Sequence, residues 1–520
     1  MRTSKRAAIS TAFTLSIYGA TAGISEAANV VTMVEQQVFR SVDPAKVHDY
    51  IDYLPVVNLY DGLVTVEPDG SLVPELAESW EVSADAREVT YKIREDATFS
   101  DGSPVEASDV VYSVERLLRI NQGPANLLAG VLAPGSTSAP DKKTVKFKLS
   151  KTFAPFLSVV PAIFVLNEDA VKPNEASDDA QTWLATNAAG AGPFTMKSFD
   201  RGTKITLVRN QTYYKGFKSN PVDEVRFLTL PDETSVLALG ASGELTITGP
   251  FLSPNTYQAL GDMGYNIEQN SGTTNLYLKL NSKAAPTDDI HIRKAIALAT
   301  DYATIREVIY RGVPLTTPLP SLFADYHASD IPAPKFDLAA AKEEVAKSKY
   351  AGKPIPITLG HLTAIKFQEE ISLLMQSNLE QIGFTVEQEA NPWNRLTELA
   401  GKPESTPDVN QIFFSATYPS PDAMFYAQYH SKAAGTWSSV DWISDQTVDK
   451  LIEDARSTVD KSEQIRIYKE LQHRLVDMQS DVFLLTQVEQ NAVSKCLEGL
   501  TVIPMRSFGY DFSRYNWTCK

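Results

Sequence analysis

Residues 99–113 read FSDGSPVEASDVVYS, and this stretch combines a strand end, a tight turn and a helix start. Asp101-Gly102 is a turn dipeptide, because glycine adopts a positive φ without strain. Ser108 is placed to cap a helix, and the carboxylate of Asp109 complements the positive end of the helix dipole. Apolar residues then recur at helical spacing, namely Val110, Val111, Val114, Leu117 and Leu118. We therefore predict a helix that begins here and packs one face against a core.

The same stretch resembles F-x-D-G-x-P-x-x-A-x-D-V-x-x-S, the signature of the family 5 extracellular solute-binding proteins. These proteins are the oligopeptide, dipeptide and nickel receptors of bacterial ABC importers. Further segments resemble the family pattern along most of the chain, including YDGL at 60–63, PELAESW at 74–80, GAGPF at 190–194, IRKAIALATD at 292–301 and VDKLI at 448–452. The resemblance implies a protein that binds and delivers a solute and does not catalyse a reaction.

Strands and helices alternate along the chain, which indicates an α/β class. The resemblance implies the two-lobed architecture of a class II periplasmic binding protein, a venus flytrap, with an extra inserted subdomain. It implies that lobe I comprises residues 28–58, 188–273 and 488–520, that 59–187 form the inserted subdomain of lobe I, and that 274–487 form lobe II. The lobes would close on a hinge made by the crossing segments near 272–281 and 484–494.

The first 27 residues have the pattern of a secretory signal peptide. A positive n-region precedes a small and apolar stretch over 7–23, and Ser25-Glu26-Ala27 offers small residues at a cleavage site. A transmembrane anchor is the alternative, but the stretch is too polar and too short to span a membrane. No Cys follows the cleavage site, so we expect a free protein in a Gram-negative periplasm and not a lipoprotein.

The 520-residue chain carries a formal net charge of −16. This charge disfavours nucleic acid and anionic membranes as partners. The length is too great for a single core, and no window after the leader has the roughly 18 unbroken apolar residues of a membrane span. We expect a soluble monomer of two or three domains.

The chain has two cysteines, Cys496 and Cys519. In an oxidising compartment such a pair favours a disulfide, and two free buried thiols are the alternative. We predict a bridge that ties the last segment of the chain to the strand before it.

The sequence lacks the residue patterns of common active sites. The six histidines are never four residues apart, and no H-E-x-x-H, G-x-S-x-G or phosphate-binding loop occurs. Carboxylate pairs are expected at the surface of so acidic a chain. We predict no catalytic residue, no metal site and no cofactor, and keep a periplasmic hydrolase of peptides or glycans as the rival from another class.

The segment FSATYPSPD at 414–422 bears on the ligand. Peptide-binding members of the family typically read W-x-A-D-Y-x-D-P-D here, and the resemblance implies that their first Asp pairs with the α-amino group of the peptide. A carboxylate suits a buried ammonium, because an unpaired buried charge costs several kcal/mol. In this chain Phe414 replaces the Trp, Thr417 the first Asp and Ser420 the second. Thr417 can form a hydrogen bond but cannot neutralise a cation.

Two interpretations of this change stay open. The ligand is neutral or hydroxyl-rich, such as a sugar derivative or a modified amino acid, or another carboxylate holds the amine, with Asp422 the nearest candidate. The resemblance also places a pocket aromatic at Trp393 and puts Asn275 and Tyr277 at the crossing between lobes, with ordinary packing as the alternative for each. The complete set of predicted ligand residues is Trp393, Phe414, Thr417, Tyr418, Asp422, Asn275 and Tyr277.

The resemblance thus implies the periplasmic substrate-binding component of an ABC transporter. It would capture a peptide or peptide-like solute between its lobes and deliver it to an inner-membrane permease that works with cytoplasmic ATPase subunits. The first alternative is the same receptor fold with a non-peptide ligand, namely a sugar derivative, a modified amino acid or a metal chelate.

Overall fold

The computed structural model describes residues 28–519, except 48, 49, 364, 502, 504 and 506–508, and only the backbone of residue 271. The signal peptide predicted over 1–27 lies outside the described residues. Among the helices that are described, none combines the length and the apolarity that a membrane crossing requires.

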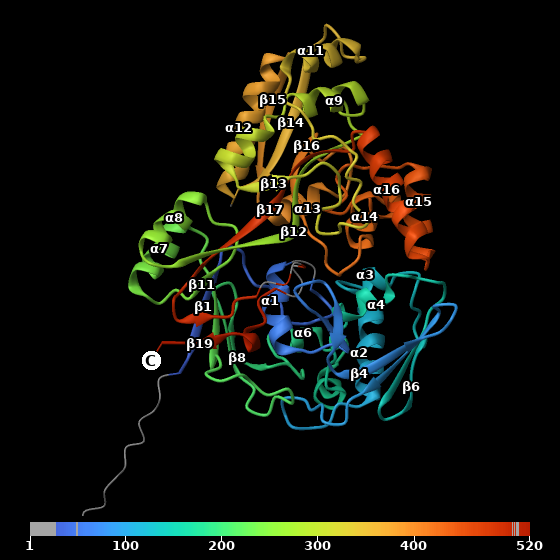
Figure 1. The fold of residues 1–520 in the computed structure, drawn as a ribbon, viewed down its shortest axis with the longest axis vertical. Helices are drawn as coiled ribbons and strands as arrows, with labels where there is room; N and C mark the ends of the chain where they lie inside the picture. The colour runs from blue at the N-terminus through green and yellow to red at the C-terminus, as the bar shows by residue number, and fades with distance from the viewer. Residues whose placement is uncertain are drawn as a thin grey trace, which may run out of the picture.

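A sheet of eleven strands runs through both lobes of the molecule (Figure 1). Its lobe I half contains β1 (Val30–Glu35), β8 (Phe194–Asp200), β9 (Lys204–Arg209), β10 (Glu224–Thr229) and β11 (Ile247–Thr248). Its lobe II half contains β13 (Gly312–Pro314), β14 (Ile355–Leu362), β15 (Phe384–Asn391) and β16 (Val409–Phe414).

Two long strands join these halves. They are β12 (Asn266–Leu280) and β17 (Asp481–Val493), which pair antiparallel over most of their length. The order along the sheet is β15-β14-β16-β12-β17-β11-β1-β10-β9-β8, with β13 paired to β17 off this path. The described chain therefore passes between the lobes on neighbouring strands at the centre of the sheet.

The largest apolar cluster includes side chains from both halves of the sheet, and each half also has a smaller cluster of its own. In lobe II, α9 (Ile290–Leu298), α11 (Leu338–Lys347) and α12 (Lys366–Gln381) pack in one apolar cluster with β14 and the lobe II ends of β12 and β17. In lobe I, α7 (Glu233–Ser242) and α8 (Pro254–Asp262) pack in another cluster with Val34 of β1.

A separate antiparallel sheet lies in the segment between β1 and β8. It has the order β4 (Ala77–Val82), β5 (Glu88–Ile93), β7 (Thr144–Lys148) and β6 (Thr137–Asp141). Every second residue of β5 faces the core, since Val89, Tyr91 and Ile93 are buried.

The helix predicted from the opening stretch is α2 (Ala107–Ile120), but its cap is not Ser108. Glu106 is the N-cap residue, and its backbone N–H donates to the Asp109 carboxylate at 2.9 Å. The Asp109 carboxylate thus accepts from a backbone N–H that has no partner within the helix. Ser108 lies one residue inside the helix and is not the cap residue. The turn before the helix is as predicted, with Gly102 at φ +86°.

A buried ion pair joins α2 to the segment before α1 (Tyr50–Leu59). Arg116 donates to both carboxylate oxygens of Asp43, at 2.8 and 2.7 Å, and to the backbone oxygen of Asp179. Both charged side chains are completely buried. The pair therefore links α2 to lobe I, and removal of either partner would leave a buried charge unpaired.

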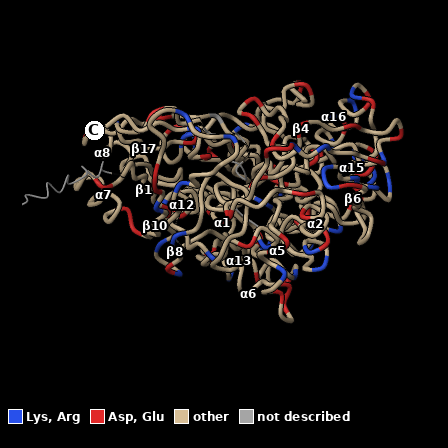
Figure 2. Tube along the Cα trace, turned by 90° about the horizontal axis from the view of Figure 1, so that it is seen from below, with Lys and Arg blue, Asp and Glu red and all other residues tan. Residues whose placement is uncertain are grey.

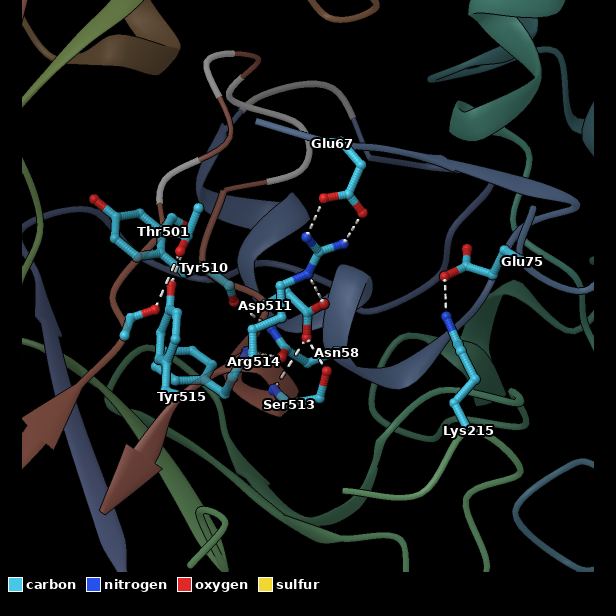
Figure 3. A network of polar contacts seen from close by, with 12 residues as sticks. Asn58, Glu67, Glu75, Lys215, Thr501, Tyr510, Asp511, Ser513, Arg514 and Tyr515 are labelled. Carbon is cyan, nitrogen blue, oxygen red and sulfur yellow. Dashed lines mark hydrogen bonds and ion pairs between the residues drawn. The ribbon is translucent and has the colours of Figure 1, made fainter. Parts of the chain in front are cut away.

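The last segment of the chain is fastened in two ways. A disulfide joins Cys496 to Cys519, the pair that the sequence predicts, with 4.8 Å between their Cα atoms. Figure 3 shows Arg514, which binds the Glu67 carboxylate at 2.9 and 3.1 Å and also pairs with Asp511. Asn58 of α1 accepts a hydrogen bond from the backbone of Phe512.

Acidic and basic residues are interspersed around the outside of the molecule (Figure 2). Many form surface pairs, such as Arg466 with Glu463 and Glu470 on α16 (Lys461–Asp477). Exposed pairs of this kind contribute little to stability.

Candidate ligand-binding site

A cavity of about 880 Å³, counted to its mouth, lies between the two lobes. Lobe I contributes Gln37, which follows β1, Tyr50 of α1 and Phe251, which follows β11. Lobe II contributes residues of β16 and of α13 (Trp393–Leu399), and β12 contributes Thr274. The site is therefore built from both sides of the crossing strands.

Aromatic side chains form much of the cavity wall. Trp393 meets Trp437 edge to face with ring centres 5.2 Å apart, and Phe414 packs on Trp437 at 5.7 Å. Phe251 from lobe I meets Phe413 from lobe II at 5.8 Å. These contacts hold flat apolar faces in place, on which a ligand can stack.

The main cavity is polar in places but uncharged. Its described lining residues include no Asp, Glu, Lys, Arg or His. The polar side chains of its lining residues carry the amides of Gln37, Gln368 and Gln411, the hydroxyls of Tyr50, Tyr53, Thr274, Ser415 and Thr417, and the indole N–H groups of Trp393 and Trp437. Neutral donors and acceptors orient a ligand by hydrogen bonds without compensating a charge on it.

A side cavity of about 530 Å³ shares Gln37, Phe251 and Trp393 with the main one. It is also lined by Glu35, a buried carboxylate that accepts a hydrogen bond from the Tyr50 hydroxyl. Gly249 makes room for it, because a Cβ atom at that position would overlap the Glu35 carboxylate. The carboxylate in the lining of the side cavity therefore comes from lobe I, whereas Thr417 comes from lobe II.

Three of the predicted ligand residues line the main cavity. They are Trp393, Phe414 and Thr417. Thr417 is half-buried there, close in sequence to the end of β16. The position that an acidic residue would occupy in peptide-binding relatives thus faces the cavity as a neutral hydroxyl.

Tyr418 and Asp422 are placed elsewhere. Neither lines the cavity, and the Tyr418 hydroxyl donates to Asp422 at 2.7 Å. Asp422 is completely buried, and its carboxylate lies 3.3 Å from the guanidinium of Arg456. That guanidinium also lies over the Tyr426 ring. Burial raises the pKa of Asp422, and the Arg456 charge opposes that rise. Because the Asp422 carboxylate already pairs with the Arg456 cation, it is poorly placed to bind the amino group of a ligand.

Asn275 and Tyr277 also point away from the cavity. The Tyr277 hydroxyl and the Asn275 amide both donate to the backbone oxygen of Pro318, at 2.7 and 3.1 Å. Thr486 of β17 donates to Asn275 at 2.7 Å. Because neighbouring residues of a strand face opposite sides, it is Thr274 that reaches the cavity.

The sequence prediction missed several lining residues, among them Gln37, Phe251, Gln368 and Gln411. They come from four separate segments, and none lies in a motif. The one local hint is in β16, where Gln411 interrupts an apolar run.

Buried charges also meet where the crossing strands enter lobe II. Lys279 of β12 lies 2.9 Å from Asp441 and 3.3 Å from Asp481 of β17, and all three side chains are completely buried. The Tyr429 hydroxyl donates to Asp481 at 2.5 Å. Burial raises the pKa of Asp481 to about 7. Over the described part of the chain, no group of His, Cys, Asp and Glu is arranged to hold a metal ion.

A family model described as bacterial extracellular solute-binding proteins, family 5 Middle, matches residues 71–436. The chain belongs to this family. The α/β class and the two-lobed architecture expected from the sequence are confirmed, and the protein is a solute-binding protein.

Two curated relatives cover nearly the whole chain. The probable D,D-dipeptide-binding periplasmic protein DdpA of Escherichia coli (strain K12) is 30% identical over 475 residues, 90% of each chain. The glutathione-binding protein GsiB of Escherichia coli O6:K15:H31 is 25% identical over 93% of this chain and 94% of its own.

Solved structures have the same fold. DppA of Helicobacter pylori, in complex with the peptide STSA, has a TM-score of 0.82 and 21% identity, covering 94% of this chain and 98% of its own. The binding protein AgaA of A. tumefaciens R10, in complex with agropinic acid, has a TM-score of 0.80 and 25% identity, covering 94% and 99%.

Proposed function

We propose that the protein is the periplasmic substrate-binding component of an ABC transporter. It captures a peptide or peptide-like small solute between its lobes and delivers it to an inner-membrane permease, which cytoplasmic ATPase subunits drive. The observation that carries this proposal is the aromatic, uncharged cavity between the lobes. The ligands in the names of DdpA and GsiB, a D,D-dipeptide and glutathione, support the ligand class.

We assign residues 28–58, 188–273 and 488–520 to lobe I, 59–187 to its inserted subdomain and 274–487 to lobe II. The crossing of β12 and β17 supports the boundaries between the lobes. The separate four-stranded sheet supports the inserted subdomain.

Binding would close the lobes on the crossing strands. Contacts at the opposite edge of the cleft support this movement. The backbone N–H of Ala154 donates to the backbone oxygen of Arg456 at 2.8 Å, and Lys151 pairs with Glu453 at 3.1 Å. A ligand that touches both lobes favours the closed form, because it binds that form more tightly. On this proposal the protein performs no catalysis and acts as a monomer without a cofactor.

The location in the periplasm rests on the leader pattern and on the name of the relative DdpA. The leader would be removed after Ala27, and no lipid anchor would follow. Intact mass of the secreted protein tests this, because retention of residues 1–27 would contradict it.

Ligand extraction tests the proposed function directly. We expect mass spectrometry of the denatured, purified protein to release a peptide-like compound, which then binds the emptied protein in calorimetry. Turnover of a peptide, ester or glycoside that a cleft mutation abolishes would instead favour the hydrolase.

The neutral lining favours a second ligand class, a solute without a free ammonium group, such as a modified amino acid or a sugar derivative. The complex of AgaA with agropinic acid supports the breadth of ligands for this fold. We expect Thr417→Asp to strengthen binding of free-amine dipeptides about 10- to 150-fold, since it adds a charge-assisted hydrogen bond. The same change should weaken binding of the co-purified ligand. Tight binding of dipeptides by the wild type, unchanged in the variant, would contradict this class.

A further inference from the structure

An open hollow lies at the edge of the cleft opposite the crossing strands, where residues 151–154 meet α15 (Gln446–Ser457); this edge is termed the closing edge. The hollow has a volume of about 690 Å³, counted to its mouth, and Lys151 of the inserted subdomain forms part of its wall. Its other lining residues belong to lobe II, namely His430, Ser431, Lys432, Asp449, Lys450 and Glu453. The groups that line it therefore come together only where the inserted subdomain touches lobe II.

A buried histidine, His430, lies in the wall of this hollow. It directly follows α14 (Asp422–Tyr429), its side chain is 4% exposed, and its ring packs on Tyr426 with the ring centres 4.6 Å apart. Its Nδ1 accepts a hydrogen bond from the backbone N–H of Lys432 at 3.1 Å. Since a backbone N–H only donates, Nδ1 carries no proton here, and the neutral ring has its proton on Nε2.

The Glu453 carboxylate of α15 connects this histidine to the inserted subdomain. Its Oε1 lies 3.4 Å from Nε2 of His430 and 3.9 Å from Nη1 of Arg456. Its Oε2 accepts a hydrogen bond from Lys151 at 3.1 Å. When the lobes close, the Lys151 ammonium thus arrives beside a carboxylate that His430 also faces.

Most charges around His430 stay in place when the lobes move, because they belong to lobe II itself. The Asp449 carboxylate lies 3.6 Å from Nδ1 and is held by the backbone N–H of Ser431 at 2.8 Å. The other lobe II charges near the ring are those of Lys432, Lys450, Glu453 and Arg456. Among the described charges at this hollow, Lys151 is the one whose distance from His430 changes with closure.

We propose that His430 is a pH-sensitive switch of the closing edge, at which a proton on the ring favours separation of the inserted subdomain from lobe II. The proton adds a positive charge beside Glu453, and this charge repels the Lys151 ammonium only while the edge is closed. It also makes Nδ1 a donor, which then faces the backbone N–H of Lys432. The closed form therefore binds the proton less tightly than the open form does, and acid shifts the edge toward the open form. This proposal rests on the closure of the lobes in the proposed function.

Mildly acidic solution protonates the histidine while the carboxylate stays ionised. Burial lowers the pKa of His430 from its ordinary value of 6.5, and the charges of Asp449 and Glu453 oppose this change. Burial raises the pKa of Glu453, but the hydrogen bond and the charge of Lys151 lower it by more. The His430 ring thus gains its proton as the pH falls below 6.5, next to a Glu453 that keeps its negative charge.

Hydrogen exchange of the Ala154 amide measures the closing edge directly. Its N–H donates to the backbone oxygen of Arg456 across the edge at 2.8 Å, so its protection from exchange reports the closed fraction. In the protein as purified, we expect the protection factor, corrected for the intrinsic rate, to fall about two- to fivefold from pH 7.5 to pH 5, the size of an interaction between partly exposed charges. Mass spectrometry of a peptide over residues 152–155 gives this factor. Equal protection at both pH values overturns the proposal but leaves the proposed function intact, which ligand extraction tests separately.

Two variants separate this switch from the other titrating groups of the protein. His430→Gln keeps a polar side chain that cannot gain a proton, and Lys151→Gln removes the charge that the proton would repel. We expect both variants to lose the fall in Ala154 protection between pH 7.5 and pH 5. His473→Gln is the control, because this histidine is 46% exposed and pairs with Asp330 inside lobe II, and it should keep the wild-type pH dependence.

Thermal unfolding checks the folding of each variant. If His430→Gln does not fold, Lys151→Gln still tests the proposal, because its side chain is 48% exposed and its loss leaves His430 in place. A pH dependence that survives in either variant overturns the proposal. A merely structural role of His430 would lower the protection by the same factor at both pH values, and that result also overturns it.

Discussion

Individual side chains set the polarity of the cavity. At position 417 a threonine hydroxyl faces the cavity, and the buried carboxylate nearby, Asp422, is committed to Arg456. Apolar area and hydrogen bonds must therefore supply most of the affinity, since the described lining of the main cavity offers no charge. Aromatic rings are the largest contributors to such a site.

Trp393→Ala should weaken binding of the co-purified ligand, whatever its identity. Loss of stacking alone corresponds to about 0.5–1.5 kcal/mol, or about 2- to 12-fold in affinity, and lost apolar burial adds to it. Calorimetry measures the change. Trp80→Ala is the matched control, because Trp80 packs on Tyr91 in the separate four-stranded sheet. Unchanged affinity in Trp393→Ala would remove this residue from the site.

Asp422→Ala should destabilise the fold and leave ligand affinity unchanged. Removing one partner of a buried ion pair strands the other charge, here Arg456, at a cost of about 3–5 kcal/mol in unfolding free energy. Urea unfolding measures this. Asp325→Ala is the control. It removes a surface pair in which the Asp325 side chain is 61% exposed and the Lys461 side chain 65%, so the unfolding free energy should change by less than about 1 kcal/mol. A large loss of affinity in a variant of normal stability would restore Asp422 as the amine anchor.

Among the elements, the crossing strands β12 and β17 combine two roles. They connect the lobes, and they carry Lys279 and Asp481 in a fully buried cluster with Asp441. Two buried carboxylates, Asp441 and Asp481, share the single positive charge of Lys279. Protonation of one carboxylate would therefore change the net charge that the folded protein buries there. Because burial raises the pKa of Asp481 to about 7, we expect the stability of these strands to depend on pH near neutrality.

Asp481→Asn should gain stability relative to the wild type as the pH rises. Burial raises the pKa of Asp481 to about 7 in the folded protein, and the unfolded value is about 3.9. A raised pKa means that the folded state binds this proton more tightly than the unfolded state does. The stability that the proton gives the wild type is fully present below about pH 4 and is lost as the pH rises through about 7.

Urea unfolding at pH 5 and pH 8 checks this prediction as a difference between variant and wild type. The comparison is needed because burial lowers the pKa of His327, His361 and His430, which changes stability in the opposite direction. Asp325→Asn, at an exposed position, should track the wild type. A difference between Asp481→Asn and wild type that does not vary with pH would show that Asp481 is ionised throughout.

At the scale of the whole molecule, the lobes touch at both edges of the cleft. The crossing strands form one edge, and the contacts of residues 151–154 with α15 (Gln446–Ser457) form the other. The Arg456 guanidinium lies 4.8 Å from the centre of the Phe153 ring. The arginine that pairs with Asp422 therefore also contacts the inserted subdomain. This second edge is positioned to hold the closed form.

Lys151→Glu should speed ligand release. It replaces the pair with Glu453 by a repulsion, and exposed pairs of this kind are worth about 0.2–1 kcal/mol, which is about a 1.4- to 5-fold change in rate. Stopped-flow tryptophan fluorescence measures dissociation of the co-purified ligand. Adding Glu453→Lys should restore much of the wild-type rate, whereas Lys461→Glu, which affects a pair inside lobe II, should leave it unchanged. An unchanged rate in Lys151→Glu would show that this edge does not hold the cleft closed.

Local patterns in the sequence were enough for the family, the α/β class and the pairing of Cys496 with Cys519. They also located α2, although its cap is Glu106 and not Ser108. Thr417, Phe414 and Trp393 were found because each lies in a segment that resembles the family pattern. The motifs depend on residues a few positions apart, which a sequence presents directly, and the chain has only two cysteines to pair.

Only the tertiary structure decided which of these residues share the cavity. Asp422 was the nearest carboxylate in sequence, yet its side chain faces Arg456, because the packing of α14 (Asp422–Tyr429) against α15 brings the two together. The Asn275 side chain donates to the backbone oxygen of Pro318, and the neighbouring residue Thr274 lines the cavity. Gln368 and Gln411 line the same cavity from a helix and a strand that are separated in the chain. A sequence reports the kinds of polar groups present, but which of them share a cavity depends on contacts between distant segments.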